Sequence, residues 1–341
     1  MPMTTAPFPR AILLFLIAGL LTLGLAAPAR AQSCTFSASN IVLGPVDVLG
    51  SSPTTATGNI AVNCSTFLGL LTSITVTIEL GDGSAGLFGS LRRLGGPSGS
   101  SLAYDLYQNP THTTIFGGSQ GTHGGQPVVL TGSSVLSLLT TTGVNVPVYA
   151  RVPGAQNAAV PGAYSATFSR QPLDVRATTE TCRPVLGCDT RVTGFTFAVQ
   201  AQVRPNCRVV ADDLDFGQHG LLDRPVDATS QVRVTCTAGT SYSLGLGHGL
   251  QAAGIGGRQM RDLAGHRVGY QLYRDAARTQ PWGLIADGLA TTDAGTGVSR
   301  AVTVHGRVPP QPTPRPVPIP IPSWSRSPID LSKDRAAAKI G

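Results

Sequence analysis

The six cysteines are the residues whose spacing most clearly predicts covalent chemistry in this chain. They fall into three pairs: Cys34 with Cys64, Cys207 with Cys236, and Cys182 with Cys188. Thiols form disulfides or bind zinc, and zinc sites typically use Cys-x-x-Cys spacing, which this sequence lacks. We therefore expect three disulfides, which persist in oxidising compartments.

Other side chains that could support catalysis or hold a metal are not grouped by spacing. Glu79 and Glu180 are the only glutamates, and no carboxylate accompanies either at motif spacing. The glycine-rich stretches lack the strand–loop–helix context of a phosphate site. The histidines also lack metal-ligand spacing: His112, His123, His219, His248, His266 and His305. The sequence predicts no enzyme, no cofactor and no metal.

One ordered motif occurs twice along the chain. After each of the long-spaced cysteine pairs come Arg-x-Leu/Met, then Tyr-x-Leu-Tyr, then an aromatic residue with glycine, then Arg-Val-Pro. The two sets are Arg92, Tyr104–Tyr107, Phe116–Gly117 and Arg151–Pro153, and Arg258, Tyr270–Tyr273, Trp282–Gly283 and Arg307–Pro309. A long ordered repeat indicates tandem homologous domains. It also predicts one long-range disulfide per domain, with Cys182–Cys188 closing a small loop.

The alternation of apolar and polar residues predicts strands. It is clear in Ser73–Glu79, Gln231–Cys236 and Ala301–His305, each of which would place one face on a core. With 41 glycines and 26 prolines, turns are frequent. The fold class is therefore all-β, with two tandem immunoglobulin-like β-sandwich domains. We expect the repeated tyrosines to pack in the cores.

The N-terminal segment has the order of a signal peptide. Arg10 precedes an apolar run from Ala11 to Ala27, and Ala29–Ala31 is a small-x-small cleavage motif. A membrane anchor is the alternative, although the run is short for a span. No later segment is long and apolar enough for a transmembrane span. The net charge of +7 is spread thinly, which argues against nucleic-acid binding.

These features divide the chain into five segments. They are a signal peptide at 1–31, domain one at 32–170, a linker with the small disulfide loop at 171–193, domain two at 194–313, and an aberrant proline-rich tail at 314–341.

The tail interrupts the expected end of domain two. Proline at alternate positions from Pro314 to Pro322 removes the amide donors that a sheet strand needs. We therefore expect the second sandwich to lack its closing strand. A shifted reading frame is one hypothesis for the tail, and a natural proline-rich extension is the alternative.

As an ordered set, the repeated motifs resemble the spore coat protein U domain family. The resemblance covers residues 32 to about 313 in two copies, and includes the Pro161–Tyr164 turn in the first copy only. The family includes pilins of archaic (Csu-type) chaperone–usher pili. It implies immunoglobulin-like domains lacking one strand, which a periplasmic chaperone and then the adjacent pilin subunit supply by strand addition.

The resemblance leads to an expectation about the segment that precedes the first cysteine of each copy. A polymerising pilin needs a donor strand before its first cysteine, whereas cleavage at Ala31 would leave Gln32 only two residues ahead of Cys34. We therefore expect domain one at the end of a fibre. Phe195–Val203, ahead of Cys207, alternates as a donor strand or an opening strand would.

Domain one also carries apolar segments where domain two is polar. We predict surface-adhesion loops at three places, with core packing as the alternative for each: Phe67, Leu68, Leu70 and Leu71; Leu87 and Phe88; Leu136, Leu138 and Leu139.

Together these expectations describe a secreted tip adhesin. It would pass through the periplasm to a surface fimbrium with the help of a chaperone and an outer-membrane usher. It would bind an abiotic or host surface and support biofilm formation. A structural protein of an extracellular or spore coat, assembled without an usher, is the alternative.

Overall fold

The computed structural model describes residues 33–69, 72–134, 137–170, 174–184, 187–252, 256–314 and 337–340. The expected signal peptide lies outside this part of the chain. The described residues form β-strands joined by turns, with two short 3-10 turns at Pro97–Gly99 and Ile285–Asp287. The fold class is therefore all-β, as the alternation predicts.

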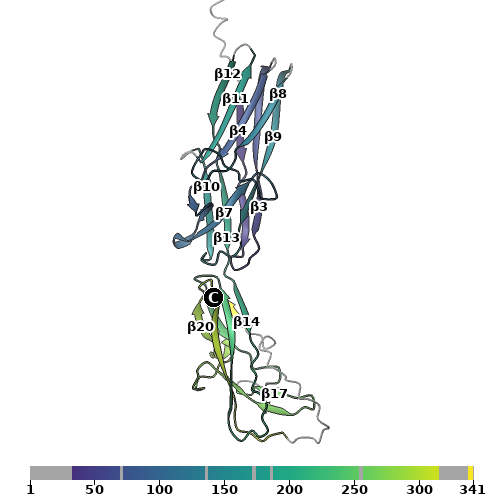
Figure 1. The fold of residues 1–341 in the computed structure, drawn as a ribbon, viewed down its shortest axis with the longest axis vertical. Coiled ribbons are helices and arrows are strands. Elements are labelled where there is room, and N and C mark those ends of the chain that lie inside the picture. The colour runs from purple at the N-terminus through teal and green to yellow at the C-terminus, as the bar shows by residue number, and fades with distance from the viewer. Residues whose placement is uncertain are drawn as a thin grey trace, which may run out of the picture.

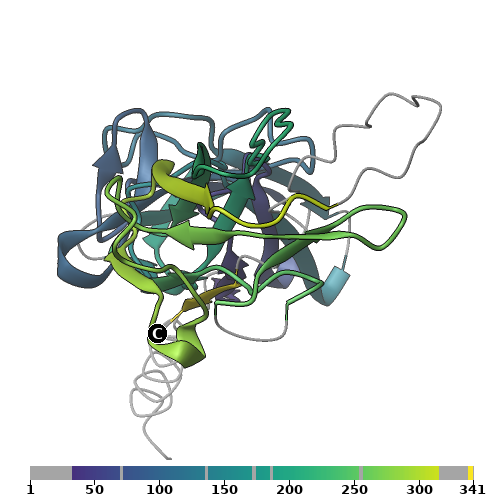
Figure 2. The same cartoon turned by 90° about the horizontal axis from the view of Figure 1, so that it is seen from below.

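Two separate hydrophobic cores divide the strands into two domains. The first core collects buried residues from Ile41 to Val203, and the second collects those from Leu214 to Val308. Domain one, with the first core, and domain two, with the second, follow each other along the long axis (Figure 1). Viewed from below, the green and yellow strands of domain two lie in front of the purple to teal strands of domain one (Figure 2).

The described part of domain one contains thirteen strands. They are β1 (Ser33–Ala38), β2 (Ile41–Val46), β3 (Thr54–Gly69), β4 (Thr72–Leu80), β5 (Leu87–Phe88), β6 (Leu91–Gly95), β7 (Ser101–Tyr107), β8 (Val128–Ser134), β9 (Ser137–Val152), β10 (Gly162–Phe168), β11 (Val175–Arg183), β12 (Gly187–Thr193) and β13 (Phe197–Val203).

These strands form two sheets. One runs in the order β1-β3-β9-β7-β6-β10-β13-β2, with β5 paired to β6, and the other runs β12-β11-β4-β8. Their buried side chains share one core, because alternate residues of each strand point to the same face of its sheet.

Domain two repeats part of this arrangement with shorter strands. They are β14 (Cys207–Ala211), β15 (Val226–Cys236), β16 (Ser241–Gly245), β17 (Gln259–Arg261), β18 (Arg267–Gly269), β19 (Gln271–Tyr273), β20 (Thr291–Ala294), β21 (Arg300–Val308) and β22 (Ala337–Ile340). The sheets run β14-β15-β21-β19 and β20-β16-β22, with β17 and β18 paired separately.

The expected linker at 171–193 is wrong, since most of it is sheet. β11 pairs with β4 along its whole length, and β12 continues that sheet as its edge strand. The segment is polar, but Val175, Ala177, Thr179 and Thr181 alternate as buried residues of β11. Small and β-branched residues fit a pleated surface even where they are polar.

The first strand of the segment expected as domain two, which begins at residue 194, packs in domain one. Strand β13 pairs antiparallel with β10 and parallel with β2, so it belongs to the sheet of domain one. Only Arg204–Asn206 separate it from β14.

Most of the tail at 314–341 lies outside the described residues. Its last part, β22, pairs antiparallel with β16, with Tyr242 opposite Ile340. In domain one, β11 pairs in the same sense with β4, the strand that corresponds to β16.

Candidate surface-adhesion site

The β11–β12 hairpin and the adjoining ends of β3, β4, β8 and β9 lie at the end of domain one remote from domain two, here called the hairpin end (Figure 1). Here β3 ends at Gly69 and β4 begins at Thr72, β8 ends at Ser134 and β9 begins at Ser137, and β11 ends at Arg183 and β12 begins at Gly187. The strand ends are aligned in pairs by the sheet register. Gly69 at the end of β3 lies opposite Ser137 at the start of β9, and Cys182 near the end of β11 lies opposite Ser73 near the start of β4.

Two of the three predicted apolar segments meet at this end. Phe67 and Leu68 close β3, Leu138 and Leu139 open β9, and Phe67 is the register partner of Leu139. The other members of these segments, Leu70, Leu71 and Leu136, lie outside the described residues. Sequence segments about 70 residues apart are thus placed side by side by one strand pair.

The hairpin end is an extension that domain two does not share. β3 and β9 each have 16 residues, whereas their counterparts β15 and β21 have 11 and 9. β15 stops at its disulfide cysteine, Cys236, but β3 runs five residues past the corresponding Cys64 to Gly69. The extra length of β3 and β9 places their apolar residues farther from domain two.

The third predicted segment, Leu87–Phe88, does not join this end. Leu87 pairs with Arg92, whose strand neighbours β7, and Asp105 of β7 pairs with Arg151 near the far end of β9. At a rise of about 3.3 Å per residue, Arg151 lies roughly 40 Å from Leu139 along β9, and the Leu87–Phe88 segment is therefore about as far from Leu139. Phe88 is 58% exposed. The third predicted segment therefore stays apart from the other two, because β5 belongs to a different part of the sheet.

The repeated arginine of the motif has a structural role that its sequence did not reveal. Arg92 is fully buried, and donates from Nε to the carbonyl of Gly81 at 2.8 Å and from Nη2 to that of Phe116 at 2.8 Å. Its Nη1 donates to Asp105 Oδ1 at 2.6 Å, and His123 Nε2 lies 2.9 Å from Asp105 Oδ2. The cluster joins strand and loop backbones in the core of domain one.

Domain two repeats the arginine without the carboxylate. Arg258 donates to the carbonyls of Leu246, Gly247 and Trp282, and Gln271 stands where domain one has Asp105. The repeated tyrosines adjoin this position, and burial raises the pKa of Tyr104. Tyr104 and Tyr270 are buried in the two cores as expected, whereas Tyr107 and Tyr273 are only partly buried.

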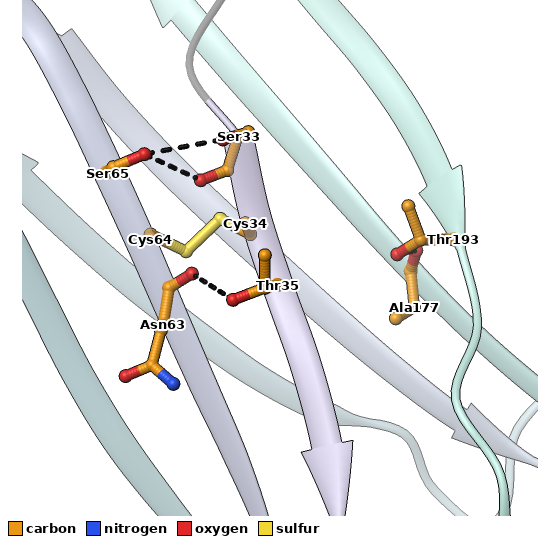
Figure 3. Close-up of a disulfide and its surroundings, with 8 residues drawn as sticks. All are labelled: Ser33, Cys34, Thr35, Asn63, Cys64, Ser65, Ala177 and Thr193. Carbon is orange, nitrogen blue, oxygen red and sulfur yellow. Dashed lines mark hydrogen bonds between the residues drawn. A yellow bond between two sulfur atoms is a disulfide. The ribbon is translucent and has the colours of Figure 1, made fainter.

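The three disulfides follow the pairing that the repeat predicts. Cys34–Cys64 joins β1 to β3, Cys207–Cys236 joins β14 to β15, and Cys182–Cys188 joins β11 to β12. Figure 3 shows the first of these, flanked by hydrogen bonds between Ser65 and Ser33 and between Thr35 and Asn63. Glu180 lies beside Cys182 and Cys188, but sulfurs bonded to each other are not thiolate ligands for a metal.

Strand β13 lies just before domain two in the chain, but its side chains pack in the core of domain one. Phe197, Val199, Ala201 and Val203 are buried in the first core, while the intervening residues face outward or are half-buried. The ring of Phe197 stacks on that of Phe168 in β10. Burial of these four side chains stabilises the contact by on the order of 5 kcal/mol.

Domain two has no counterpart of β10 or β13 among its described residues. In domain one, β13 lies between β10 and β2, with Gly162 opposite Val203 and Val199 opposite Ile41. The corresponding segment to β2 in domain two contains Leu214, which is fully buried, and Phe216.

The described residues contain no helix of sufficient length and apolarity to cross a membrane. The three disulfides place the folded chain among proteins of oxidising compartments.

Several solved structures resemble the chain at low identity. The chaperone–tip adhesion subunit complex CsuC–CsuE of archaic Csu pili from Acinetobacter baumannii matches with 15% identity and a TM-score of 0.49, covering 91% of this chain and 99% of that one. The CupB6 tip adhesin of Pseudomonas aeruginosa matches with 11% identity and a TM-score of 0.33, covering 82% and 88%. CfaE, the adhesive subunit of CFA/I fimbria of enterotoxigenic Escherichia coli, matches with 12% identity and a TM-score of 0.26, covering 48% and 46%.

Comparison by family gives a more direct result. No curated protein matches the chain. The Spore Coat Protein U domain model matches residues 20–169 and 193–317, starting 14 residues before Cys34 and 14 residues before Cys207. β13 therefore falls within the second match although it packs in domain one. With most of its length matched in two copies, the chain belongs to the spore coat protein U domain family.

Proposed function

We propose that the chain is a non-enzymatic exported fimbrial subunit, the two-domain tip adhesin of a chaperone–usher pilus. It attaches the cell to abiotic or host surfaces and supports biofilm formation. Domain one is the adhesin domain and domain two is the pilin domain. The signal peptide directs the chain through the inner membrane, and the assembled protein ends on the cell surface.

The observation that carries this proposal is the position of β13. A segment from the start of the second family match completes the sheet of domain one, between β2 and β10. This is strand addition within one chain, the operation by which pilins of the family are joined. Domain one thereby has its missing strand already, and needs no partner subunit to supply it.

Domain two is the part that would take a strand from outside. The described part of domain two offers no counterpart of β10 or β13, and its sheets are correspondingly less complete. The periplasmic chaperone would cover this opening first, at the outer-membrane usher, and the adjacent pilin subunit would replace it. An unpaired sheet edge otherwise favours aggregation, which explains why assembly would need a chaperone.

The hairpin end supports the adhesive role of domain one. The extended β3 and β9 carry Phe67 and Leu139 to the end of the molecule opposite domain two. In a fibre joined through domain two, that end faces away from the shaft. Apolar side chains exposed there would gain about 25 cal/mol for each Å² buried on a surface.

Electron microscopy with gold-labelled domain one and an adhesion assay would test this proposal together. We expect label at fibre ends, and we expect Leu70→Ser combined with Leu71→Ser to abolish attachment to polystyrene while fibres still form. Phe88→Ser is the matched control, because it removes an exposed apolar side chain away from the hairpin end. Label along the whole fibre would contradict the tip position. A chain that is secreted and stable without chaperone or usher would favour the coat-protein alternative.

A further inference from the structure

A polar cleft opens between the two sheets of domain one, beside the first disulfide. Its volume is about 160 Å³, and it is lined from β1 by Ser33 and Cys34 and from the β11–β12 hairpin by Thr179, Thr181, Arg183, Asp189, Arg191 and Thr193. Figure 3 shows the Cys34–Cys64 disulfide on one sheet and Thr193 with Ala177 on the other. β1 and β12 are the edge strands of their sheets, so the sandwich is open on this side.

The inner face of the second sheet changes from apolar to charged toward this opening. On β4 the inward positions are Ile74, Val76 and Ile78, and the register partners of the last two on β11 are Thr179 and Ala177. Directly opposite residues of an antiparallel pair share a face. Thr179 lies opposite Arg191 on the edge strand β12, so a buried threonine and an exposed arginine line the cleft from the same face.

Two of these polar side chains are largely buried but keep their hydroxyls free toward the cleft. Thr179 and Thr181 are 6% and 5% exposed, and neither hydroxyl makes a hydrogen bond to any residue that the structure describes. Neither hydroxyl oxygen is among the fully buried polar atoms that lack a partner, so each reaches solvent through the cleft. Both hydroxyls are therefore available to a ligand that enters the cleft.

The charge of the cleft favours an anion. Arg183 lies 3.6 Å from Asp189, whereas Arg191 forms no ion pair and no side-chain hydrogen bond with the described residues. Glu180 points to the other face of β11, and is not among the lining residues. An arginine fork binds carboxylate and other oxyanions through two parallel hydrogen bonds.

We propose that this cleft binds an acidic sugar unit of a polysaccharide, with Arg191 holding its anionic oxygen group and Thr179 and Thr181 its hydroxyls. Threonine hydroxyls donate and accept, as sugar hydroxyls do. The volume is below the 300–1,000 Å³ typical of sites for whole drug-sized ligands, so one charged unit enters rather than an oligosaccharide. The site shares no residue with the predicted apolar segments, and does not depend on the chain standing at a pilus tip.

Binding of the full secreted chain to defined polymers would test this site. The probes are polygalacturonate for carboxylate, dextran sulfate for sulfate, and neutral dextran, measured by microscale thermophoresis in about 150 mM salt to screen loose charge attraction. We expect binding to one or both acidic polymers and none to dextran. The stronger acidic polymer identifies which oxyanion the cleft prefers.

Two matched variants distinguish binding in the cleft from nonspecific attraction between the polymer and the protein's positive charge. Arg191→Gln should weaken binding about tenfold or more, since charge-assisted hydrogen bonds are the strong ones. Arg176→Gln, the same charge change on the outer face of β11, should leave affinity within about twofold.

Changing the two threonines tests the site without changing its charge. Thr179→Val with Thr181→Val should also lose binding, without lowering the unfolding temperature, because the lost hydroxyls have no partner in the protein. Equal losses in the Arg191 and Arg176 variants, or no binding of either acidic polymer, would overturn the proposal.

Discussion

Phe197 stacks on Phe168 with ring centroids 4.8 Å apart and ring planes inclined by only 5°. Phe168 ends the last strand of the first family match, and Phe197 begins the strand that opens the second. The two copies of the repeat are therefore joined by more than a linker. The second copy contributes its first strand to the core of the first.

Loss of the Phe197 ring should unfold domain one more easily. Phe197→Ala leaves a cavity against Phe168 in a buried site, and such changes cost about 3–5 kcal/mol. Differential scanning calorimetry of the whole chain should show a lowered transition for domain one and little change in domain two. Gln200→Ala, on the exposed face of the same strand, is the control. An equal shift in the two variants would mean that β13 is not packed as described.

Removal of the buried carboxylate of Asp105 in domain one should lower the free energy of unfolding more than removal of its counterpart in domain two, the side chain of Gln271. Asp105→Ala leaves the Arg92 charge buried without its partner, at a cost of about 3–5 kcal/mol. Gln271→Ala should cost about 1 kcal/mol, because Arg258 keeps its carbonyl acceptors and loses only a 3.4 Å contact. Urea unfolding of both variants makes the comparison. Similar destabilisation by both would show that the charge in domain one is not held by Asp105.

Acid should weaken the loop that Asp82 holds in domain one. Burial alone would raise the pKa of Asp82, but hydrogen bonds from the backbone N–H groups of Thr122 and His123 outweigh it and lower the pKa. A carboxyl whose pKa is lowered by folding contributes stability above its unfolded pKa of about 3.9, and that contribution is lost as pH falls through the folded value.

The variant Asp82→Asn should therefore behave differently at two pH values. It should be less stable than wild type by about 0.5–1 kcal/mol at pH 7, a figure discounted for solvent screening, and the gap should narrow at pH 3. Urea midpoints at both pH values measure this. Asp223→Asn, an exposed aspartate, should show no such change with pH. A gap that widens in acid would contradict the hydrogen-bond explanation.

The disulfides should differ in what they contribute, because they close loops of different length. Cys34–Cys64 spans 30 residues and Cys182–Cys188 spans 6. Loop-closure entropy gives about 4 kcal/mol for the first and about 2 kcal/mol for the second. Paired Cys→Ser variants compared by calorimetry should rank in that order. The reverse ranking would mean that the small bridge has a role in native packing as well.

Much of the architecture follows from the sequence because its signals are local or repeated. The long-spaced cysteines gave the disulfide pairs, and strand alternation gave β4, β15 and β21. β11 was missed because its inward residues include Thr179 and Thr181, where periodicity of hydrophobicity is weak. The alternation of β-branched residues was the signal that could have found it.

The site was harder to predict because it depends on register between distant strands. Phe67 and Leu139 meet only through the β3–β9 ladder, and the same ladder places Leu87 far away. Likewise, alternation in Phe195–Val203 predicts a strand but not which domain it enters. Local patterns define strands, whereas long-range pairing decides which side chains share a surface.

Native mass spectrometry of periplasmic complexes formed with a co-expressed Csu-type chaperone tests the central claim most directly. Strand β13 already lies in the sheet of domain one, and the proposed function has domain two receive a strand from outside. The proposed tip adhesin should therefore bind one chaperone per chain, and cross-links should fall only within domain two. Two chaperones per chain would show that domain one is also incomplete, and a stable chain with none would contradict assembly through a chaperone–usher pathway.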